Sequence, residues 1–155
     1  MSTLSTSTKA CARAILDVVP QVMRTVRSEM RQHRAADLTV VQFRTLAFLS
    51  RQPGASLSVV ADHIGLTLPA MSTLVDGLVD RKLVARSPAP NDRRRITLTL
   101  TDLGQTTWEI THTRTEAKLA DRLVGLSAGD RELVTRAMEI LRPLFASEPS
   151  DLAVP

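Results

Sequence analysis

The sequence is poor in residue types on which several classes of protein depend. Its 155 residues include one cysteine, one tryptophan and no tyrosine. The single cysteine, Cys11, excludes an intrachain disulfide framework and fits a reducing compartment, so we expect a cytoplasmic protein. Because only 3% of the residues are aromatic, stacking against the bases of single-stranded nucleic acid is disfavoured.

Long apolar runs are also missing. No stretch approaches the roughly 18–20 consecutive apolar residues that a membrane-spanning helix needs. The first ten residues are rich in Ser and Thr and lack the apolar segment of a signal peptide. We therefore expect no membrane partner, and a length of 155 residues with 43% hydrophobic content predicts one domain with a continuous core.

Groupings that carry catalysis or bind metal are absent from the sequence as well. The three histidines, His33, His63 and His112, lie far apart, and none belongs to a motif with metal-ligand spacing. There is no phosphate-binding loop, no dinucleotide fingerprint and no nucleophile elbow. The sequence therefore predicts a protein that is not an enzyme and has no cofactor and no metal site.

What the chain does contain is basic charge confined to a short stretch. The formal net charge is +4, from 20 basic and 16 acidic residues. Six of the basic residues and one of the acidic residues lie between Arg81 and Arg95, which leaves 14 basic and 15 acidic residues elsewhere. Such a patch is the electrostatic footprint of phosphate binding, although a solvated Arg-rich loop has the same composition.

Apolar residues recur at steps of three and four along most of the chain, which predicts helices. The first helix spans about residues 8–34 and contains Pro20, where we expect a kink or a break. Polar N-caps open the later helices, and Gly or Pro punctuation ends several of them. The predicted N-caps are Thr39 (with Gln42 as a capping box), Ser56, Thr67, Thr101 and Ser127, and the helices that they open end near residues 52, 64, 81, 126 and 148.

Between the fourth and fifth helices the period changes from helical to alternating. Residues 83–86 form a short predicted strand, and residues 96–100 alternate apolar and polar side chains. The Pro-, Asn- and Asp-containing segment 87–94 between them is predicted to be a turn. The expected fold is therefore mainly α with a small two-stranded β-hairpin.

The helices at about 57–64 and 67–81, joined by a turn at Gly65-Leu66, form a predicted helix-turn-helix. The second helix would enter the major groove with its N-terminal residues near the base edges. The following hairpin would act as a basic wing whose arginines reach the minor groove or the phosphates. The predicted DNA-binding residues are Thr67, Pro69, Ala70, Ser72 and Thr73 on the helix and Arg86, Asp92, Arg93, Arg94 and Arg95 on the wing.

Several motifs resemble the MarR family (multiple antibiotic resistance regulators). They are Leu38-Thr39-Val40-Val41-Gln42-Phe43, Leu57-Ser58-Val59-Val60-Ala61 and Met71-Ser72-Thr73-Leu74-Val75-Asp76, together with Asp92-Arg93-Arg94 followed by Leu100-Thr101 and Gly104. Asp92-Arg93-Arg94 matches the family's Asp-x-Arg wing signature, and Leu100-Thr101 with Gly104 matches its Leu-Thr-x-x-Gly helix start.

The resemblance implies one domain over residues 1–155, a winged helix-turn-helix with N- and C-terminal dimerisation helices. The winged lobe would span about 38–100, and the dimerisation helices about 8–34 and 101–148. A homodimer would bind a pseudo-palindromic operator of double-stranded DNA, with one wing at each half-site. Arg94 would enter the minor groove, and Asp92 would hold the wing by pairing with a basic neighbour.

Three positions depart from the family's pattern. Thr73 and Gly77 stand where relatives often carry larger basic residues, so fewer contacts to DNA are expected from the middle of the helix. Lys82 replaces the usual glycine after the recognition helix. It must either adopt a strained conformation or extend the helix.

The resemblance also raises two possibilities for a signal. Relatives bind small aromatic or phenolic effectors between the dimerisation helices and the DNA-binding lobe, which makes Trp108 and His112 candidate effector-binding residues. A core or dimer-interface role for Trp108 is the alternative. One branch of the family senses organic hydroperoxides through a cysteine in its first helix, but that branch relies on tyrosine hydroxyls, which this chain lacks.

Sequence-specific transcriptional regulation is the function that these observations predict. We expect a repressor that is released from its operator by a small aromatic effector. The alternatives are an architectural protein that binds DNA without sequence choice and a redox sensor of the same family that uses Cys11.

Overall fold

The computed structural model describes residues 7–32 and 38–145. Helices dominate these residues, and three short strands lie between the second helix and the fifth. In chain order the elements are α1 (Thr8–Gln32), α2 (Val40–Arg51), β1 (Ala55–Ser56), α3 (Leu57–Ile64), α4 (Leu68–Asp80), β2 (Val84–Ala89), β3 (Asp92–Leu100), α5 (Asp102–Leu123) and α6 (Ala128–Phe145).

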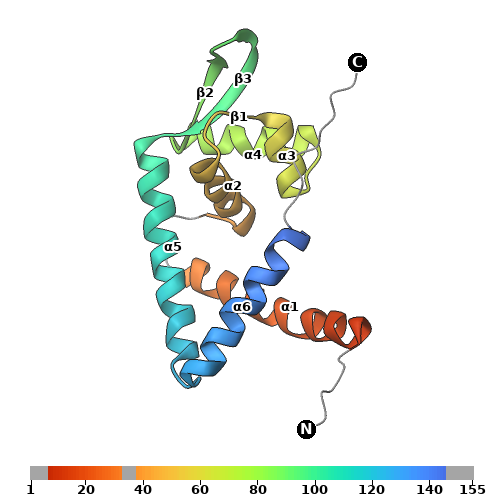
Figure 1. Cartoon of the computed structure of the whole chain (residues 1–155). Coiled ribbons are helices and arrows are strands. Elements are labelled where there is room, and N and C mark those ends of the chain that lie inside the picture. The colour runs from red at the N-terminus through yellow and green to blue at the C-terminus, as the bar shows by residue number, and fades with distance from the viewer. Residues whose placement is uncertain (1–6, 33–37, 146–155) are drawn as a thin grey trace.

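The elements separate into a compact lobe and a set of outlying helices (Figure 1). The lobe contains α2, α3, α4 and the sheet. From the lobe, α5 runs along one side of the molecule to its opposite end, where α6 and α1 lie. This arrangement confirms the predicted winged helix-turn-helix with long helices at both ends of the chain.

Side-chain caps fix the helix starts where the sequence predicts them. Thr39 and Gln42 form the expected capping box, because the Thr39 hydroxyl accepts a hydrogen bond from the Gln42 N–H and the Gln42 side chain accepts one from the Thr39 N–H. The hydroxyls of Ser56, Thr67, Thr101 and Ser127 likewise accept hydrogen bonds from backbone N–H groups three residues later. These bonds satisfy N–H groups that have no partner inside the helix.

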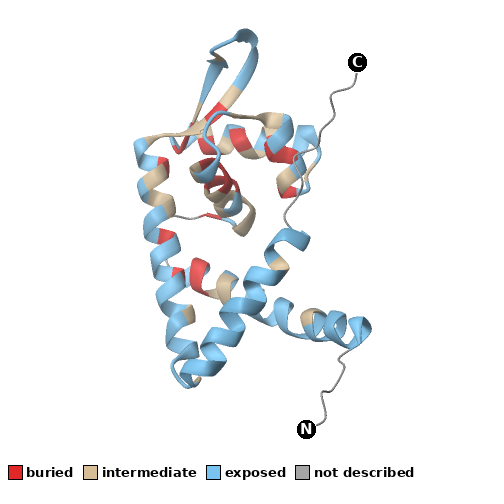
Figure 2. Cartoon of the chain, viewed as in Figure 1, coloured by how far each residue is buried: buried red, intermediate tan, exposed pale blue. Residues whose placement is uncertain are grey.

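Burial is concentrated in the lobe, as Figure 2 shows. The core is built from apolar residues of α2, α3, α4, β2, β3 and the segments that connect them, and Leu46, Val60, Met71, Val75 and Leu78 are completely buried. By contrast, no residue of α6 is buried. The lobe therefore has its own core, whereas α6 leaves most of its apolar side chains exposed.

The sheet differs from the predicted two-stranded hairpin. It has three antiparallel strands in the order β1-β3-β2. Its hairpin is longer than expected, because most of segment 87–94 continues the two strands instead of forming a turn. Pro88 is tolerated because β2 is an edge strand, and the pairing shifts at a bulge between Pro88 and Ala89. The strand β1 was not predicted, because its two residues are too few to show the alternation of apolar and polar side chains that indicates a strand.

Other helix boundaries lie close to the predicted ones. The helix α1 is continuous through Pro20, so the predicted break is not present. The end of α5, at Leu123, comes about one turn earlier than expected. His33, Arg34 and the tail after Phe145 lie outside the described residues.

No single helix in the described ranges has the length and hydropathy needed to cross a membrane. The helices α3 and α4 together reach the length and hydropathy of a membrane span, but the chain bends by 106° between them. Six of their residues are buried in the core of the lobe.

Candidate nucleic-acid interface

A sharp turn joins α3 to α4 in the geometry of a helix-turn-helix. Gly65 ends α3 in the left-handed conformation (φ 81°), which glycine adopts without a steric cost. The N–H groups of Gly65 and Leu66 both donate to the Ala61 carbonyl, at 2.9 and 3.0 Å. The resulting 106° bend lies within the range of helix-turn-helix motifs.

The two faces of α4 have different roles. Met71, Val75 and Leu78 are buried in the lobe core. The predicted readers lie on the other face and at the helix start: Thr67, Pro69, Ala70 and Thr73 are exposed, and Ser72 is half-buried. The Thr73 hydroxyl donates to the Pro69 carbonyl at 3.1 Å. The exposed start of α4 is therefore small and uncharged, and it can approach the floor of a major groove closely.

Leu68, at the first position of α4, is also exposed, with 51% of its surface accessible. An exposed leucine next to the readers can contact the methyl group of thymine.

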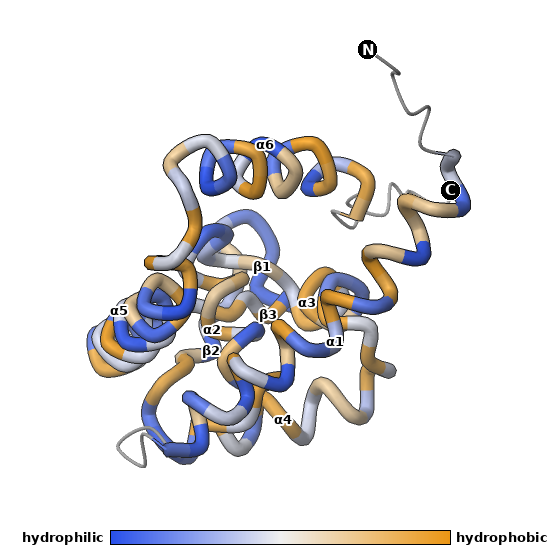
Figure 3. Tube along the Cα trace, turned by 90° about the horizontal axis from the view of Figure 1, so that it is seen from below, coloured by the Kyte–Doolittle hydropathy of each residue, from blue (hydrophilic) through white to orange (hydrophobic). Residues whose placement is uncertain are grey.

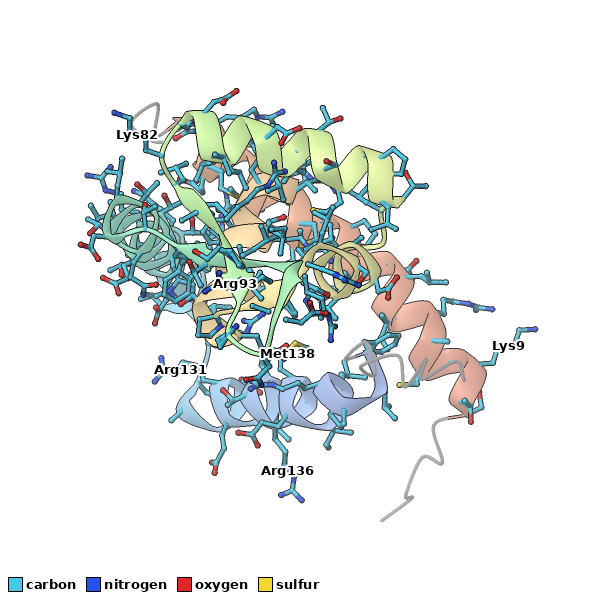
Figure 4. All side chains as sticks on the ribbon, turned by 90° about the horizontal axis from the view of Figure 1, so that it is seen from above. Lys9, Lys82, Arg93, Arg131, Arg136 and Met138 are labelled. Atoms are coloured by element: carbon cyan, nitrogen blue, oxygen red, sulfur yellow. The ribbon has the colours of Figure 1, made fainter. Side chains whose placement is uncertain are left out.

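The wing carries an exposed basic tip. Arg93, Arg94 and Arg95 are all exposed on β3. All three lie between Asp92 and Ile96, where the pairing of β3 with β2 shifts, so they occupy the irregular end of the hairpin next to the wing tip. Figure 4 looks down on the wing and shows Arg93 above the lobe.

Asp92 stabilises the wing in a different way from the one predicted. Its carboxylate accepts a hydrogen bond from the backbone N–H of Arg94 at 3.0 Å. None of the ion pairs between described residues involves Asp92. The expected pairing with a basic side chain is therefore wrong, because a carboxylate two residues before a backbone N–H reaches that donor without leaving the turn.

Arg86, predicted as a free phosphate contact, is joined to the recognition helix. Its guanidinium lies 2.6 Å from the carboxylate of Asp76. Asp76 belongs to α4 and Arg86 to β2, so this ion pair connects the helix with the base of the wing. The sequence predicts that Asp76 faces solvent or a neighbouring arginine, but it does not identify Arg86, because only the fold brings the two elements together.

The end of α4 is held against the start of α5. The Thr101 hydroxyl donates to the Lys82 carbonyl at 2.5 Å, and the Thr101 N–H donates to the Leu83 carbonyl at 3.1 Å. A Cβ atom at Gly104 would overlap the Leu83 carbonyl oxygen. The Leu-Thr-x-x-Gly motif thus has a physical explanation: Thr101 both caps α5 and bonds to the wing base, and Gly104 permits the close approach.

Trp108 and His112 lie together on α5. Their rings are 5.2 Å apart, and Trp108 is half-buried against the lobe core. The Trp108 indole N–H is buried and has no hydrogen-bond partner among the described residues. A buried donor without a partner is costly, and an incoming molecule with an acceptor atom would satisfy it.

The remaining titratable candidates fit structural roles. His63 stacks on Phe48 at 4.3 Å, and burial, reinforced by the charges of Arg44 and Arg51, lowers the pKa of His63. Cys11 is exposed on α1. Within residues 7–32 and 38–145, no three His, Cys, Asp or Glu side chains form a group that could hold a metal ion.

Comparison with known proteins gives a consistent result. A sequence profile of the MarR family matches residues 36–95. An HTH-type transcriptional repressor of Mycobacterium tuberculosis is 32% identical over 104 residues, which are 67% of this chain and 75% of the repressor.

Solved structures share the fold. RV1404 of Mycobacterium tuberculosis superposes with a TM-score of 0.79 at 23% identity, covering 93% of this chain and 97% of that protein. CouR of Rhodococcus jostii RHA1, solved with p-coumaroyl-CoA bound, gives a TM-score of 0.69 at 22% identity, covering 92% of this chain and 93% of CouR.

Geometry and comparison agree. The exposed start of α4 and the basic wing beside it fit DNA binding, and so do the family profile and the similarity to a repressor. The chain belongs to the MarR family, and it is a DNA-binding transcriptional regulator, not an enzyme.

Proposed function

We propose that the protein acts as a homodimeric repressor on a pseudo-palindromic operator. The observation that carries this proposal is the placement of a small, uncharged helix start next to an arginine-bearing wing on one lobe. The relative at 32% identity is named a transcriptional repressor, which supports repression over activation. A protein that acts on DNA and has a single, exposed cysteine is expected in the cytoplasm.

The dimer is supported by apolar side chains of α1 and α6 that the described residues of one chain leave exposed. Hydrophobic residues recur along α1 and α6, which lie outside the lobe (Figure 3). Leu133, Met138, Ile140, Leu144 and Phe145 of α6 are each at least half exposed. A second copy of the chain would cover these residues, and a two-fold dimer would present two recognition helices to two half-sites.

Roles within the lobe follow from side-chain chemistry. Thr67, Pro69, Ala70, Ser72 and Thr73 would lie against the base edges, with few strong hydrogen-bonding groups to discriminate between them. A large share of the specificity would then come from DNA shape and half-site spacing.

The wing would supply the charge that the recognition helix lacks. Arg94 would enter the minor groove, Arg93 and Arg95 would bind flanking phosphates, and Asp92 would shape the wing tip. Arg86, because it pairs with Asp76, would set the angle between wing and helix in addition to contributing charge.

A small aromatic effector is proposed to bind beside Trp108 and His112. The unpartnered indole N–H of Trp108 would donate to the effector, and the His112 ring would stack on it. CouR, which has the same fold, binds an aromatic thioester. Since Trp108 is the only tryptophan, its fluorescence reports binding directly. Titration with benzoate and with p-coumaroyl-CoA should shift the emission of the parent protein and leave a Trp108→Phe variant silent.

Selection from random duplexes with the purified protein tests the main proposal. A repressor of this design enriches one short palindrome and binds it at a salt concentration where random duplex is released, because non-specific affinity is mainly counterion release. Failure to enrich any sequence would instead assign an architectural role.

No described side chain forms a hydrogen bond with the thiol of Cys11, so nothing in its surroundings favours a redox sensor.

A further inference from the structure

The residue that follows the recognition helix has a backbone conformation that favours glycine. Lys82 has φ 59°, and no other non-glycine residue in the described ranges has a positive φ. A side chain in this left-handed region clashes with the neighbouring carbonyl, so lysine is less stable here than glycine would be. Strained backbone of this kind persists where the residue has a function.

The structural bonds at this position belong to the backbone alone. The Lys82 N–H donates to the Val79 carbonyl at 2.8 Å, and the Lys82 carbonyl accepts from the Thr101 hydroxyl. Glycine would make the same two bonds. The Lys82 side chain is exposed and takes part in no ion pair or hydrogen bond between described residues. Contacts within the chain therefore do not explain why a lysine is present.

The side chain lies where it can contribute to DNA binding. Lys82 stands between α4, which carries the predicted readers, and β2, which leads into the wing. In Figure 4, which views the molecule from above, the Lys82 side chain projects outward from the end of α4 at the edge of the molecule, whereas Arg93 of the wing lies nearer the middle. It belongs to the stretch 81–95, in which six basic residues accompany one acid.

We propose that Lys82 binds a phosphate of the DNA backbone beside the major groove, and that the chain accepts the strained conformation to keep this charge. The contact supplies positive charge that the start of α4 lacks. The inference rests on the DNA binding of the family and not on the proposed operator, because a phosphate contact is independent of base sequence.

A stabilising role is the competing explanation. The last turn of α4 contains no basic residue, so a lysine just beyond it could stabilise the carbonyl end of the helix dipole. The two explanations predict opposite effects of Lys82→Gly. If the lysine serves the dipole, the variant loses stability and binds DNA normally. If the lysine serves DNA, the variant gains stability and binds DNA more weakly.

The experiment measures binding to a mixed-sequence duplex as a function of salt, together with thermal unfolding. For Lys82→Gly we expect the unfolding midpoint to rise by about 2–4 °C. We expect the slope of log K against log salt to fall by about 0.9 for each lost phosphate contact, which corresponds to about fivefold weaker binding per contact near 0.15 M salt. Lys82→Asn, which tolerates the same φ, should lose the same affinity.

Two further variants act as controls. Lys82→Arg keeps the charge and should retain the affinity and the salt slope of the parent. Lys118→Gln removes one exposed charge from α5, outside the lobe, and should change neither. Parental affinity and salt slope in both Lys82→Gly and Lys82→Asn would overturn the proposal. Since the duplex has no defined operator, that result would leave sequence-specific binding untouched, whereas selection experiments test the operator separately.

Discussion

At the scale of single residues, the ion pair between Arg86 and Asp76 connects the two parts of the interface. Both side chains are partly exposed, at 38% and 55%, so solvent screening leaves the pair at most about 1 kcal/mol of stability. Its larger effect is geometric, because it ties the base of the wing to the recognition helix.

Asp76→Asn should therefore release Arg86 from its ion pair. It should also raise the net charge by one, because a carboxylate is removed, without unfolding the lobe. We expect tighter binding to random duplex and a smaller ratio of operator to random affinity. Arg86→Gln should weaken binding to both DNAs. Fluorescence anisotropy at one fixed salt concentration measures the ratio, and a ratio unchanged in Asp76→Asn would show that the pair does not position the wing.

Arg94 is the residue on which the minor-groove contact depends. Arg94→Ala should weaken operator binding by about 1–3 kcal/mol, with the largest loss where the flanking sequence is A·T-rich. Circular dichroism and light scattering should show an unchanged fold and mass. Arg95→Ala, a matched change at the next position of the same strand, should weaken binding equally for all flanking sequences. Equal losses in the two variants on every flank would contradict the assignment.

At the scale of secondary-structure elements, the junction between β2 and α5 decides how the wing is held. Gly104→Ala would force α5 away from the Leu83 carbonyl and should lower the free energy of unfolding by about 1–3 kcal/mol or more. Gly77→Ala is the matched control, because a Cβ at this position in α4 would meet nothing within 4 Å apart from its chain neighbours and the backbone of its own helix. In a helix interior this change should raise stability by about 0.5–1 kcal/mol. Chemical denaturation measures both, and equal stability of the two variants would exclude the close approach as the reason for glycine.

Helix starts were predictable from the sequence, because each cap is a local bond over three residues. Thr39 with Gln42, and likewise Ser56 and Thr67, satisfy N–H groups that lie immediately after them in the chain. The length of the hairpin was not predictable, since Pro88 is compatible with a strand only at the edge of a sheet, and that place is set by the pairing of β3 with β1.

Candidate site residues divide in the same way. The exposed start of α4 and the arginines of the wing follow from periodicity and charge. Other features could not be predicted. The partner of Arg86 and the burial of the Trp108 indole depend on contacts between distant elements. The hydrogen bond of Asp92 depends on the exact course of the backbone at the wing tip. The strain at Lys82 was one of two outcomes that the missing glycine left open, and the structure selects it.

At the scale of the whole molecule, the exposed apolar faces of α1 and α6 predict a dimer. Light scattering at micromolar concentration should give twice the chain mass of 17.0 kDa. Leu144→Glu, at a position with 71% exposure, should yield a folded monomer with much weaker operator binding, because burying an unpaired carboxylate opposes association. A parent protein that remains monomeric at this concentration would contradict the dimer.

In the proposed dimer, two rigidly joined recognition helices read two half-sites of one operator. Once an operator has been selected, the most direct measurement compares its affinity with that of the same sequence carrying about five extra base pairs between the half-sites, which rotates them by about half a helical turn. The insertion should reduce binding toward the level of random duplex, and a full turn of about ten base pairs should restore the relative orientation of the half-sites. Affinity unchanged by the half-turn insertion would show that the two lobes bind independently and would contradict the account.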